Sequence, residues 1–134
     1  MWRRYLIIAT ILGTLLVGAA GCGSHGAGGY GPVGQVVPYT DRSYTVEPFS
    51  SATVTINTSE GAVIEGYLTV RGGNDDVRFY IEDSYGNKVL DINRVNGRYD
   101  FSYVVTSAGF HTMYFDNSFS IVTSKQVYLH YRVR

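Results

Sequence analysis

The chain has 134 residues, and its 11 basic and 11 acidic side chains give a formal net charge of zero. Setting aside residues 1–21, which hold Arg3 and Arg4, lowers the basic count to 9 and leaves a formal charge of −2. The remaining basic residues are scattered singly among acidic ones, which excludes the basic patch of a nucleic-acid-binding protein. The single cysteine excludes a disulfide within the chain.

The first 22 residues follow the order of a secretory leader. Arg3 and Arg4 form a positive start, residues 5–17 are apolar apart from two threonines and a glycine, and small residues at 18–21 precede Cys22. This order is typical of a bacterial lipoprotein signal, in which the leader is cleaved and the cysteine thiol carries a lipid. We therefore predict a signal peptide at 1–21 and lipidation of Cys22.

An uncleaved membrane span is the alternative interpretation of the same segment. The apolar stretch from Tyr5 to Ala20 is short against the ~20 residues that a spanning helix needs, so cleavage is favoured. Either interpretation holds the folded part of the chain at the cell membrane or cell envelope, on the extracytoplasmic face. The membrane, reached through the lipid anchor, is thus the first expected partner.

Residues 22–35 are rich in glycine and contain too little apolar surface to fold. We predict a flexible tether, with a root-mean-square span of about 20 Å for a dozen such residues. His25 lies in this stretch, and one histidine in a glycine-rich tract is not a metal site.

From residue 36 to residue 134 the hydrophobic residues alternate with polar ones, which indicates strands in a single domain. Turn residues at 59–61, 72–76, 85–87, 96–97 and 108–109 separate the strands. We predict an all-β domain, a jelly-roll-like antiparallel β-sandwich of about seven to nine strands. Gly66 interrupts a good strand, which costs stability unless it marks a bulge or a close backbone approach, and we predict a bulge near 65–67. The residues expected to face the core are Ala52, Val54, Ile56, Ile64, Leu68, Val70, Val77, Phe79, Ile81, Tyr99, Phe101, Tyr103, Val105, Val127, Leu129, Tyr131 and Val133.

One series of residues carries a likeness to a known family. It reads Val77-x-Phe79-x-Ile81-x-Asp83-x-x-Gly86, Gly97-x-Tyr99-x-Phe101, Gly109-Phe110, Tyr114-Phe115-x-Asn117-x-Phe119-Ser120 and Lys125-x-Val127-x-Leu129. The series resembles the GOLD (Golgi-dynamics) domain, the lumenal β-sandwich of eukaryotic cargo receptors of the early secretory pathway. The resemblance implies a β-sandwich fold and a role in protein or ligand binding at a membrane.

The sequence also departs from that family. Its cargo receptors usually carry a pair of cysteines, one of them beside the phenylalanine that Phe115 resembles, and Tyr114 holds that place here. They continue into a coiled coil, a membrane span and a cytoplasmic tail, whereas this sequence stops at Arg134. We therefore expect no recruitment of a vesicle coat, and we expect the anchor at the opposite end, through Cys22.

Two registers are open for the strand near residue 115. The resemblance implies that Phe115 lies in the core, whereas an alternation that places Phe110, Thr112 and Tyr114 inward requires the opposite. A one-residue shift turns every side chain of a strand to the other face, so only one of the two is correct.

Catalytic chemistry is not indicated. His111 and His130 lie inside predicted strands, and neither follows a nucleophile in a recognisable pattern. His111 alternates with Phe110, which is compatible with a solvent-facing position, and a structural role is favoured over a catalytic one. We predict no enzyme activity and no cofactor.

The carboxylates Asp75, Asp76 and Asp83 are weak candidates for calcium ligands. Their spacing does not follow a calcium loop, and the same residues suit plain exposed turns. We therefore predict no metal site.

The aromatic content supplies the remaining candidates for binding. Among 12 tyrosines, Tyr67, Tyr80 and Tyr128 fall on the outward side of the predicted strands. Outward tyrosines form an amphipathic platform for a protein edge or for sugar rings. The alternative, which the pattern favours because it does not group them on one sheet, is that they pack across strands.

These observations predict a membrane-tethered, extracytoplasmic module that binds an unidentified protein and no nucleic acid. The first alternative is an accessory β-sandwich of a secreted system that binds a glycan or calcium. The second is a purely structural lipoprotein of the envelope.

Lipidation at Cys22 makes a direct prediction. In Cys22→Ala the thiol that accepts the lipid is gone, so we expect an unprocessed or mislocalised precursor. Membrane fractionation and gel mobility measure the outcome. Unchanged membrane retention together with unchanged mobility would contradict lipidation.

Overall fold

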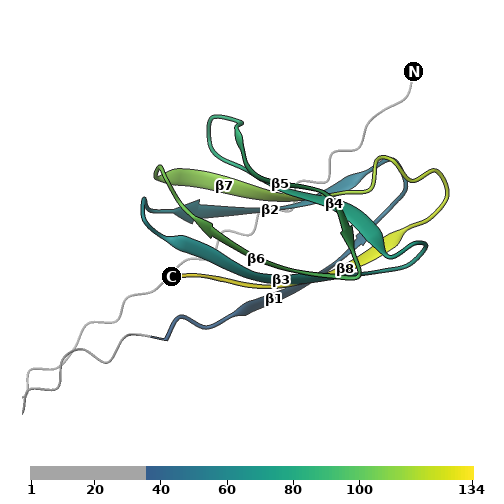
Figure 1. Ribbon diagram of the computed structural model, residues 1–134, viewed down its shortest axis with the longest axis horizontal. Coiled ribbons are helices and arrows are strands. Elements are labelled where there is room, and N and C mark those ends of the chain that lie inside the picture. Colours follow the sequence, from purple (N-terminus) through teal and green to yellow (C-terminus); the bar gives the residue numbers. More distant parts are fainter. Residues whose placement is uncertain (1–35) are drawn as a thin grey trace, which may run out of the picture. The chain divides into compact units, whose positions relative to one another are not determined.

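The structure is a computed structural model that describes residues 36–134; the predicted leader, the tether with His25, and Cys22 lie outside the described residues. Residues 36–134 contain no helix that is long and apolar enough to cross a membrane. Eight strands follow one another along the chain (Figure 1): β1 (Thr40–Val46), β2 (Ser51–Thr58), β3 (Val63–Arg71), β4 (Asp76–Glu82), β5 (Lys88–Asn96), β6 (Arg98–Val104), β7 (Gly109–Asp116) and β8 (Lys125–Val133).

The strands form two four-stranded sheets that stack face to face (Figure 1). One sheet has the order β1-β8-β3-β6, which we call sheet A, and the other has the order β2-β7-β4-β5, which we call sheet B. Every strand pair is antiparallel, and all connections except the β4–β5 hairpin cross from one sheet to the other. The predicted all-β antiparallel sandwich is confirmed.

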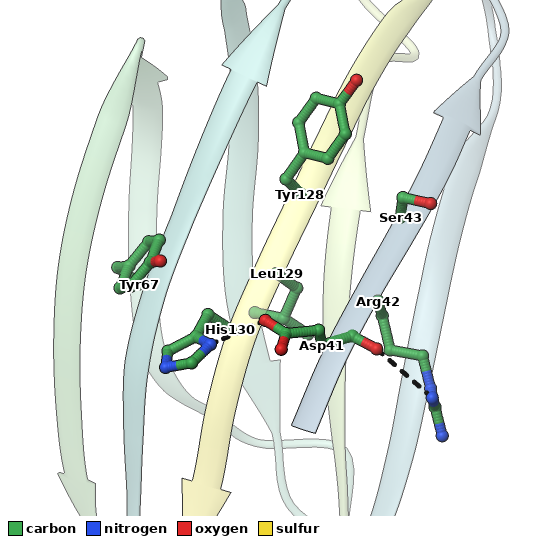
Figure 2. Close-up of a pocket in the computed structure, with 7 residues that line it drawn as sticks. All are labelled: Asp41, Arg42, Ser43, Tyr67, Tyr128, Leu129 and His130. Carbon is green, nitrogen blue, oxygen red and sulfur yellow. Dashed lines mark hydrogen bonds and ion pairs between the residues drawn. The ribbon is translucent and has the colours of Figure 1, made fainter. Parts of the chain in front are cut away.

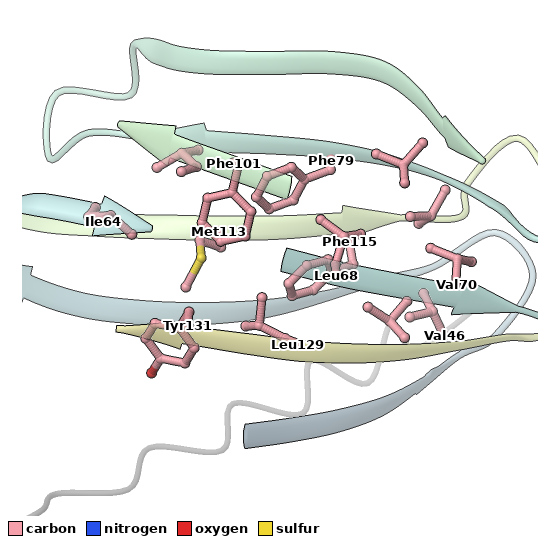
Figure 3. Packing of buried hydrophobic residues seen from close by; sticks show 14 of the residues in the cluster. Val46, Ile64, Leu68, Val70, Phe79, Phe101, Met113, Phe115, Leu129 and Tyr131 are labelled. Carbon is pink, nitrogen blue, oxygen red and sulfur yellow. The ribbon is translucent and has the colours of Figure 1, made fainter. Parts of the chain in front are cut away.

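The core lies between the sheets, where alternate side chains of all eight strands meet (Figure 3). Every residue expected to face inward belongs to this core or packs against it. At its centre Phe79 of sheet B stacks on Phe115, with ring centroids 5.6 Å apart, and contacts Phe101 of sheet A at 5.0 Å. Aromatic pairs of this kind add to the burial of apolar surface that holds the two sheets together.

The register of β7 follows the family resemblance. Phe115 is 0% exposed, whereas Tyr114 points outward and stacks on Tyr80 at 4.6 Å. The alternation that placed Phe110 inward is wrong, since Phe110 is 60% exposed. The buried positions of this strand are instead His111, Met113 and Phe115. Because His111 is polar but faces inward, the alternation of apolar and polar residues along β7 indicated the wrong face.

His111 is therefore not on a solvent face. Its Nδ1 lies 2.9 Å from Thr58 Oγ1 and 3.3 Å from the carbonyl oxygen of Gly109. The imidazole is buried, and these partners lower the cost of burial because they satisfy one of its two ring nitrogens.

Gly66 marks a close backbone approach and not a bulge. It pairs in register with Phe101 on one side and Tyr131 on the other, so the predicted bulge near 65–67 is wrong. A Cβ at this position would lie 2.0 Å from the carbonyl oxygen of His130. The irregularities fall instead in the β4–β5 pair, between Val77 and Phe79 and between Ile81 and Glu82.

The buried position of Phe115 predicts a large loss of stability in Phe115→Ala. Large-to-small core substitutions cost on the order of 3–5 kcal/mol, because apolar contact is lost and a cavity remains. Tyr114→Ala, on the outer face, should cost distinctly less. Denaturant unfolding of both variants measures the difference, and an equal or larger loss at Tyr114 would contradict this register.

Candidate functional site

The outer face of sheet A brings together polar and aromatic side chains from distant parts of the chain. In the register of the sheet, His130 of β8 lies opposite Asp41 of β1 and opposite Tyr67 of β3. Tyr67 in turn lies opposite Asp100 of β6. Directly opposed residues share a face of the sheet, so these four side chains form one transverse line across it.

His130 is stacked between two tyrosine rings. Its ring centroid lies 4.2 Å from that of Tyr39, with the planes 13° apart, and 4.9 Å from that of Tyr67, with the planes 29° apart. Two guanidinium groups extend the line: Arg132 lies 4.5 Å from the Tyr39 ring centroid and Arg98 lies 3.7 Å from that of Tyr67. We call Tyr39, His130 and Tyr67 the aromatic row.

Carboxylates hold the two guanidinium groups in place. Glu65 accepts from Arg132 at 2.6 Å and from Arg134 at 3.0 Å, and Arg98 pairs with Asp100 at 2.9 Å. Hydrogen bonds from Arg134 and then Arg132 lower the pKa of Glu65, and the hydrogen bond from Arg98 lowers the pKa of Asp100. Both carboxylates therefore stay ionised and keep the arginines on the row.

His130 has a carboxylate partner of its own. Its Nδ1 lies 2.6 Å from Asp41 Oδ1, so a proton on that nitrogen is donated to the carboxylate. The Asp41 side chain is mostly exposed, whereas that of His130 is half-buried between the rings. The contact fixes the orientation of the imidazole and leaves oxygen atoms of Asp41 at the surface.

A shallow hollow of about 270 Å³ opens beside the aromatic row (Figure 2). Figure 2 shows His130 between Asp41 and Tyr67, with Tyr128 farther along β8. Sites that enclose small molecules usually exceed ~300 Å³, so this hollow suits a surface contact better than an enclosed ligand. It is lined by Asp41, Arg42, Ser43, Tyr67, Tyr128, Leu129 and His130.

The three tyrosines singled out from the sequence do not share one site. Tyr67 and Tyr128 line the hollow on sheet A, whereas Tyr80 lies on the outer face of sheet B. There Tyr80 stacks on Tyr114, with Lys88 4.7 Å and Arg78 5.2 Å from its ring centroid. Sheet pairing thus groups two of the candidates and separates the third.

Sequence reasoning did not single out Tyr39, His130, Arg98 or Arg132. Tyr39 precedes the first strand, so no alternation marks it, and it enters the row only by stacking on His130. The only signal in the sequence was that His130 and Arg132 alternate outward on a strand of inward apolar residues.

Two of the carboxylates considered as calcium ligands cap turns. Asp75 Oδ1 accepts from the backbone N–H of Gly72 at 2.7 Å. Asp83 Oδ1 accepts from the N–H groups of Tyr85 at 2.9 Å and Asn87 at 2.8 Å. A hydrogen bond from the Asn87 side chain is the main cause that lowers the pKa of Asp83. These carboxylates serve local turns.

The third carboxylate is buried in an ion pair. Asp76 Oδ1 lies 2.8 Å from Lys125 Nζ, and Asp76 Oδ2 lies 3.0 Å from Arg94 Nε. A Cβ at Gly73 would lie 2.7 Å from Lys125 Nζ, so the glycine gives the ammonium room. Among residues 36–134 no three His, Cys, Asp or Glu side chains are grouped as metal ligands would be.

His111 and Thr58 are a base and a hydroxyl within hydrogen-bonding distance, which is the pair of groups that nucleophilic catalysis uses. Both residues are buried, so no substrate reaches them. His111 Nε2 has no partner, so nothing orients the ring from its other side as a catalytic base requires. The contact is structural.

With this geometry in place, the comparisons identify the chain. The sequence matches the family described as emp24/gp25L/p24 family/GOLD over residues 42–134. The chain belongs to this family. The match spans the sandwich from β1 to the end of β8 and agrees with the resemblance read from Val77 to Leu129. The aromatic row therefore lies on a GOLD domain, and domains of this family are binding modules of the cargo-receptor type, not enzymes.

No curated protein matches the sequence. The crystal structure of Aeromonas hydrophila PliG, a periplasmic lysozyme inhibitor of g-type lysozyme, is similar with a TM-score of 0.43 and 10% sequence identity, over 74% of this chain and 89% of that chain.

The buried ion pair makes a prediction for stability. In Lys125→Ala, Asp76 keeps only the exposed Arg94 as its partner, and breaking a buried pair costs about 3–5 kcal/mol. The double variant Asp76→Asn, Lys125→Ala should lose much less than the sum of the losses in Lys125→Ala and Asp76→Asn, because neither member of the pair is then left as a buried charge without its partner. Denaturant unfolding measures the four free energies. Additive losses would show that the two groups do not interact.

Proposed function

We propose that this GOLD-family chain is a membrane-tethered, extracytoplasmic module that binds another protein through the outer face of sheet A. The observation that carries the proposal is the aromatic row with its two guanidinium groups, held in place by carboxylates before any partner arrives. Tyrosine and arginine are the residues that contribute most to protein interfaces. Groups that are already ordered lose little conformational entropy on binding.

The packing of the row favours a protein over a glycan. A sugar ring needs the open face of an aromatic side chain. Here His130 and Arg132 both pack on Tyr39, and His130 and Arg98 both pack on Tyr67. These contacts occupy ring faces that a sugar would use, whereas polar groups such as the Asp41 carboxylate stay available to a protein edge.

The expected location rests on the sequence before the domain. A charged start, an apolar run and small residues lead to Cys22, and such a leader exports the chain and attaches it to a membrane. The glycine-rich residues 22–35 then separate the anchor from the sandwich. The family's role in binding at membranes agrees with this placement.

The proposal is tested with two matched variants of the full-length protein. Tyr67→Ala alters the aromatic row, and Tyr80→Ala removes a half-buried tyrosine that is also stacked and also lies near a guanidinium, but on sheet B. Each protein is crosslinked in its native membranes, solubilised and purified, and the crosslinked partner is quantified. We expect Tyr67→Ala to lose most of the partner and Tyr80→Ala to retain it.

Other outcomes would count against the proposal. Equal capture by the wild type and both variants would show that the outer face of sheet A is not the contact surface. Binding of a purified envelope glycan that Tyr67→Ala abolishes would support the carbohydrate-binding alternative. Circular dichroism of both variants shows whether they fold.

A further inference from the structure

Four large apolar side chains are exposed at one end of the sandwich. Phe49, in the loop between β1 and β2, is 67% exposed. Phe119, Ile121 and Val122, in the loop between β7 and β8, are 40%, 72% and 83% exposed. The two loops lie at the same end because Val46 pairs with Lys125 and Ser51 pairs with Asp116. We call these four residues the apolar tip.

Few charges lie near these side chains. Residues 117–124 and 48–51 contain no Asp, Glu, Lys or Arg. Glu47, at the start of the first loop, accepts a hydrogen bond from the hydroxyl of Ser124, and the guanidinium of Arg94 lies 4.9 Å from the Phe119 ring centroid. Loops of a soluble surface are normally polar, so four exposed apolar residues at one end need an explanation.

The two loops are fastened to each other by Asn117. Its buried side-chain amide faces three carbonyl oxygens, of Val46 at 3.0 Å, Glu47 at 3.2 Å and Thr123 at 2.9 Å. Its backbone N–H donates to the carbonyl oxygen of Ser50 at 2.9 Å. These hydrogen bonds fix the positions of both loops, and with them the positions of the four side chains of the apolar tip.

Phe49 is held in an uncommon backbone conformation. Its φ is 59°, a left-handed value that bulky residues rarely adopt, and its N–H donates to the carbonyl oxygen of Ser120 at 3.3 Å. Strain of this kind persists where the surroundings impose it, and it is concentrated at functional sites. Here it keeps an exposed phenylalanine beside the second loop.

We propose that the apolar tip inserts into a lipid bilayer, at the boundary between headgroups and acyl chains. The side chains stand on two separate loops, and none of them lines the hollow on sheet A. Phe119 alone among the four lines a second hollow, which Arg78 and Arg94 also line. Protruding apolar points penetrate a bilayer, whereas a protein partner needs a continuous complementary patch. Residues 48–51 and 117–124 carry no charge to that depth, and the long side chain of Arg94 is able to place its guanidinium among the headgroups.

The inference rests on the proposed tethering, which brings the tip within reach of the membrane. The tip lies at the end of β1, whereas the described chain begins at the other end of that strand. The seven residues of β1 span about 23 Å. The roughly 14 residues between Cys22 and Val36 span up to about 45 Å when extended, so the anchor and the tip are able to occupy one membrane together.

Insertion of the tip would orient the aromatic row. The strands would stand along the membrane normal, with Tyr39 and the start of β1 at the end away from the lipid. The outer face of sheet A would then be roughly perpendicular to the membrane plane and accessible from the side, at some distance from the headgroups. A partner on the same membrane would approach it laterally.

The experiment uses full-length protein purified from membranes and reconstituted into vesicles of phosphatidylcholine and phosphatidylglycerol. Ile121→Cys carries an environment-sensitive fluorophore, and Phe110→Cys is the matched control, since it replaces an equally exposed apolar residue toward the opposite end of the sandwich. The parent chain gives the background from Cys22. Lipids that bear a nitroxide in the upper acyl chain quench a fluorophore that enters the bilayer.

We expect a blue shift and several-fold stronger quenching at position 121 than at position 110. Equal, water-like emission at both positions in protein that floats with the vesicles would overturn the inference and leave the tethering intact. A blue shift at 121 without quenching would also overturn it and assign the tip to a protein contact. Protein that does not float with the vesicles would contradict the tethering and the insertion together.

Discussion

The stacked pair of Phe79 and Phe115 at the centre of the core sets the orientation of the strands around it. Because side chains alternate along a strand, Phe115 in the core forces Tyr114, Thr112 and Phe110 onto the outer face of β7. The same rule places Leu129 inward and His130 outward on β8. On sheet A, the aromatic row on the outer face and the core residues on the inner face thus both follow from the register of β8.

Buried polar residues specify the two ends of the sandwich. Asn117 fastens the β1–β2 loop to the β7–β8 loop, and Lys125 with Asp76 fixes the start of β8 beside the start of β4. His111 bonds Thr58 near the opposite end. A core of apolar side chains tolerates small slips, whereas these groups lose their partners if a strand moves, so they select one arrangement.

Much of the fold follows from the sequence, since alternation is a local signal. All residues expected inward on five strands belong to the core or pack against it, and the turns predicted at 85–87 and 96–97 separate strands. Where a polar residue occupied an inward position, as His111 does, alternation gave the wrong phase and the likeness to GOLD domains gave the right one. At Gly66 the predicted bulge was wrong, because only the pairing with β8 shows that the glycine serves a close backbone approach.

The candidate site was harder to predict because it depends on pairing between distant segments. Tyr67 and Tyr128 were found as outward tyrosines, but the position of His130 between Tyr39 and Tyr67 requires the neighbours of β8 to be known. Tyr80 satisfied the same local rule and lies on the other sheet. The residues of the apolar tip follow no periodic pattern, so the sequence did not indicate that the two loops expose them at the same end of the sandwich.

The place of β1 at the edge of sheet A has a mechanical consequence. Within the part of the chain that the structure describes, β8 is the single strand that pairs with β1, and the expected membrane anchor precedes β1 in the sequence. Any tension between the membrane and the domain enters the sandwich at residues 36–39 and reaches Tyr39 and Asp41 before any other part of the sheet. Tension on the expected tether would therefore reach the aromatic row first, and the proposed contact with a partner would weaken before the fold itself is disturbed.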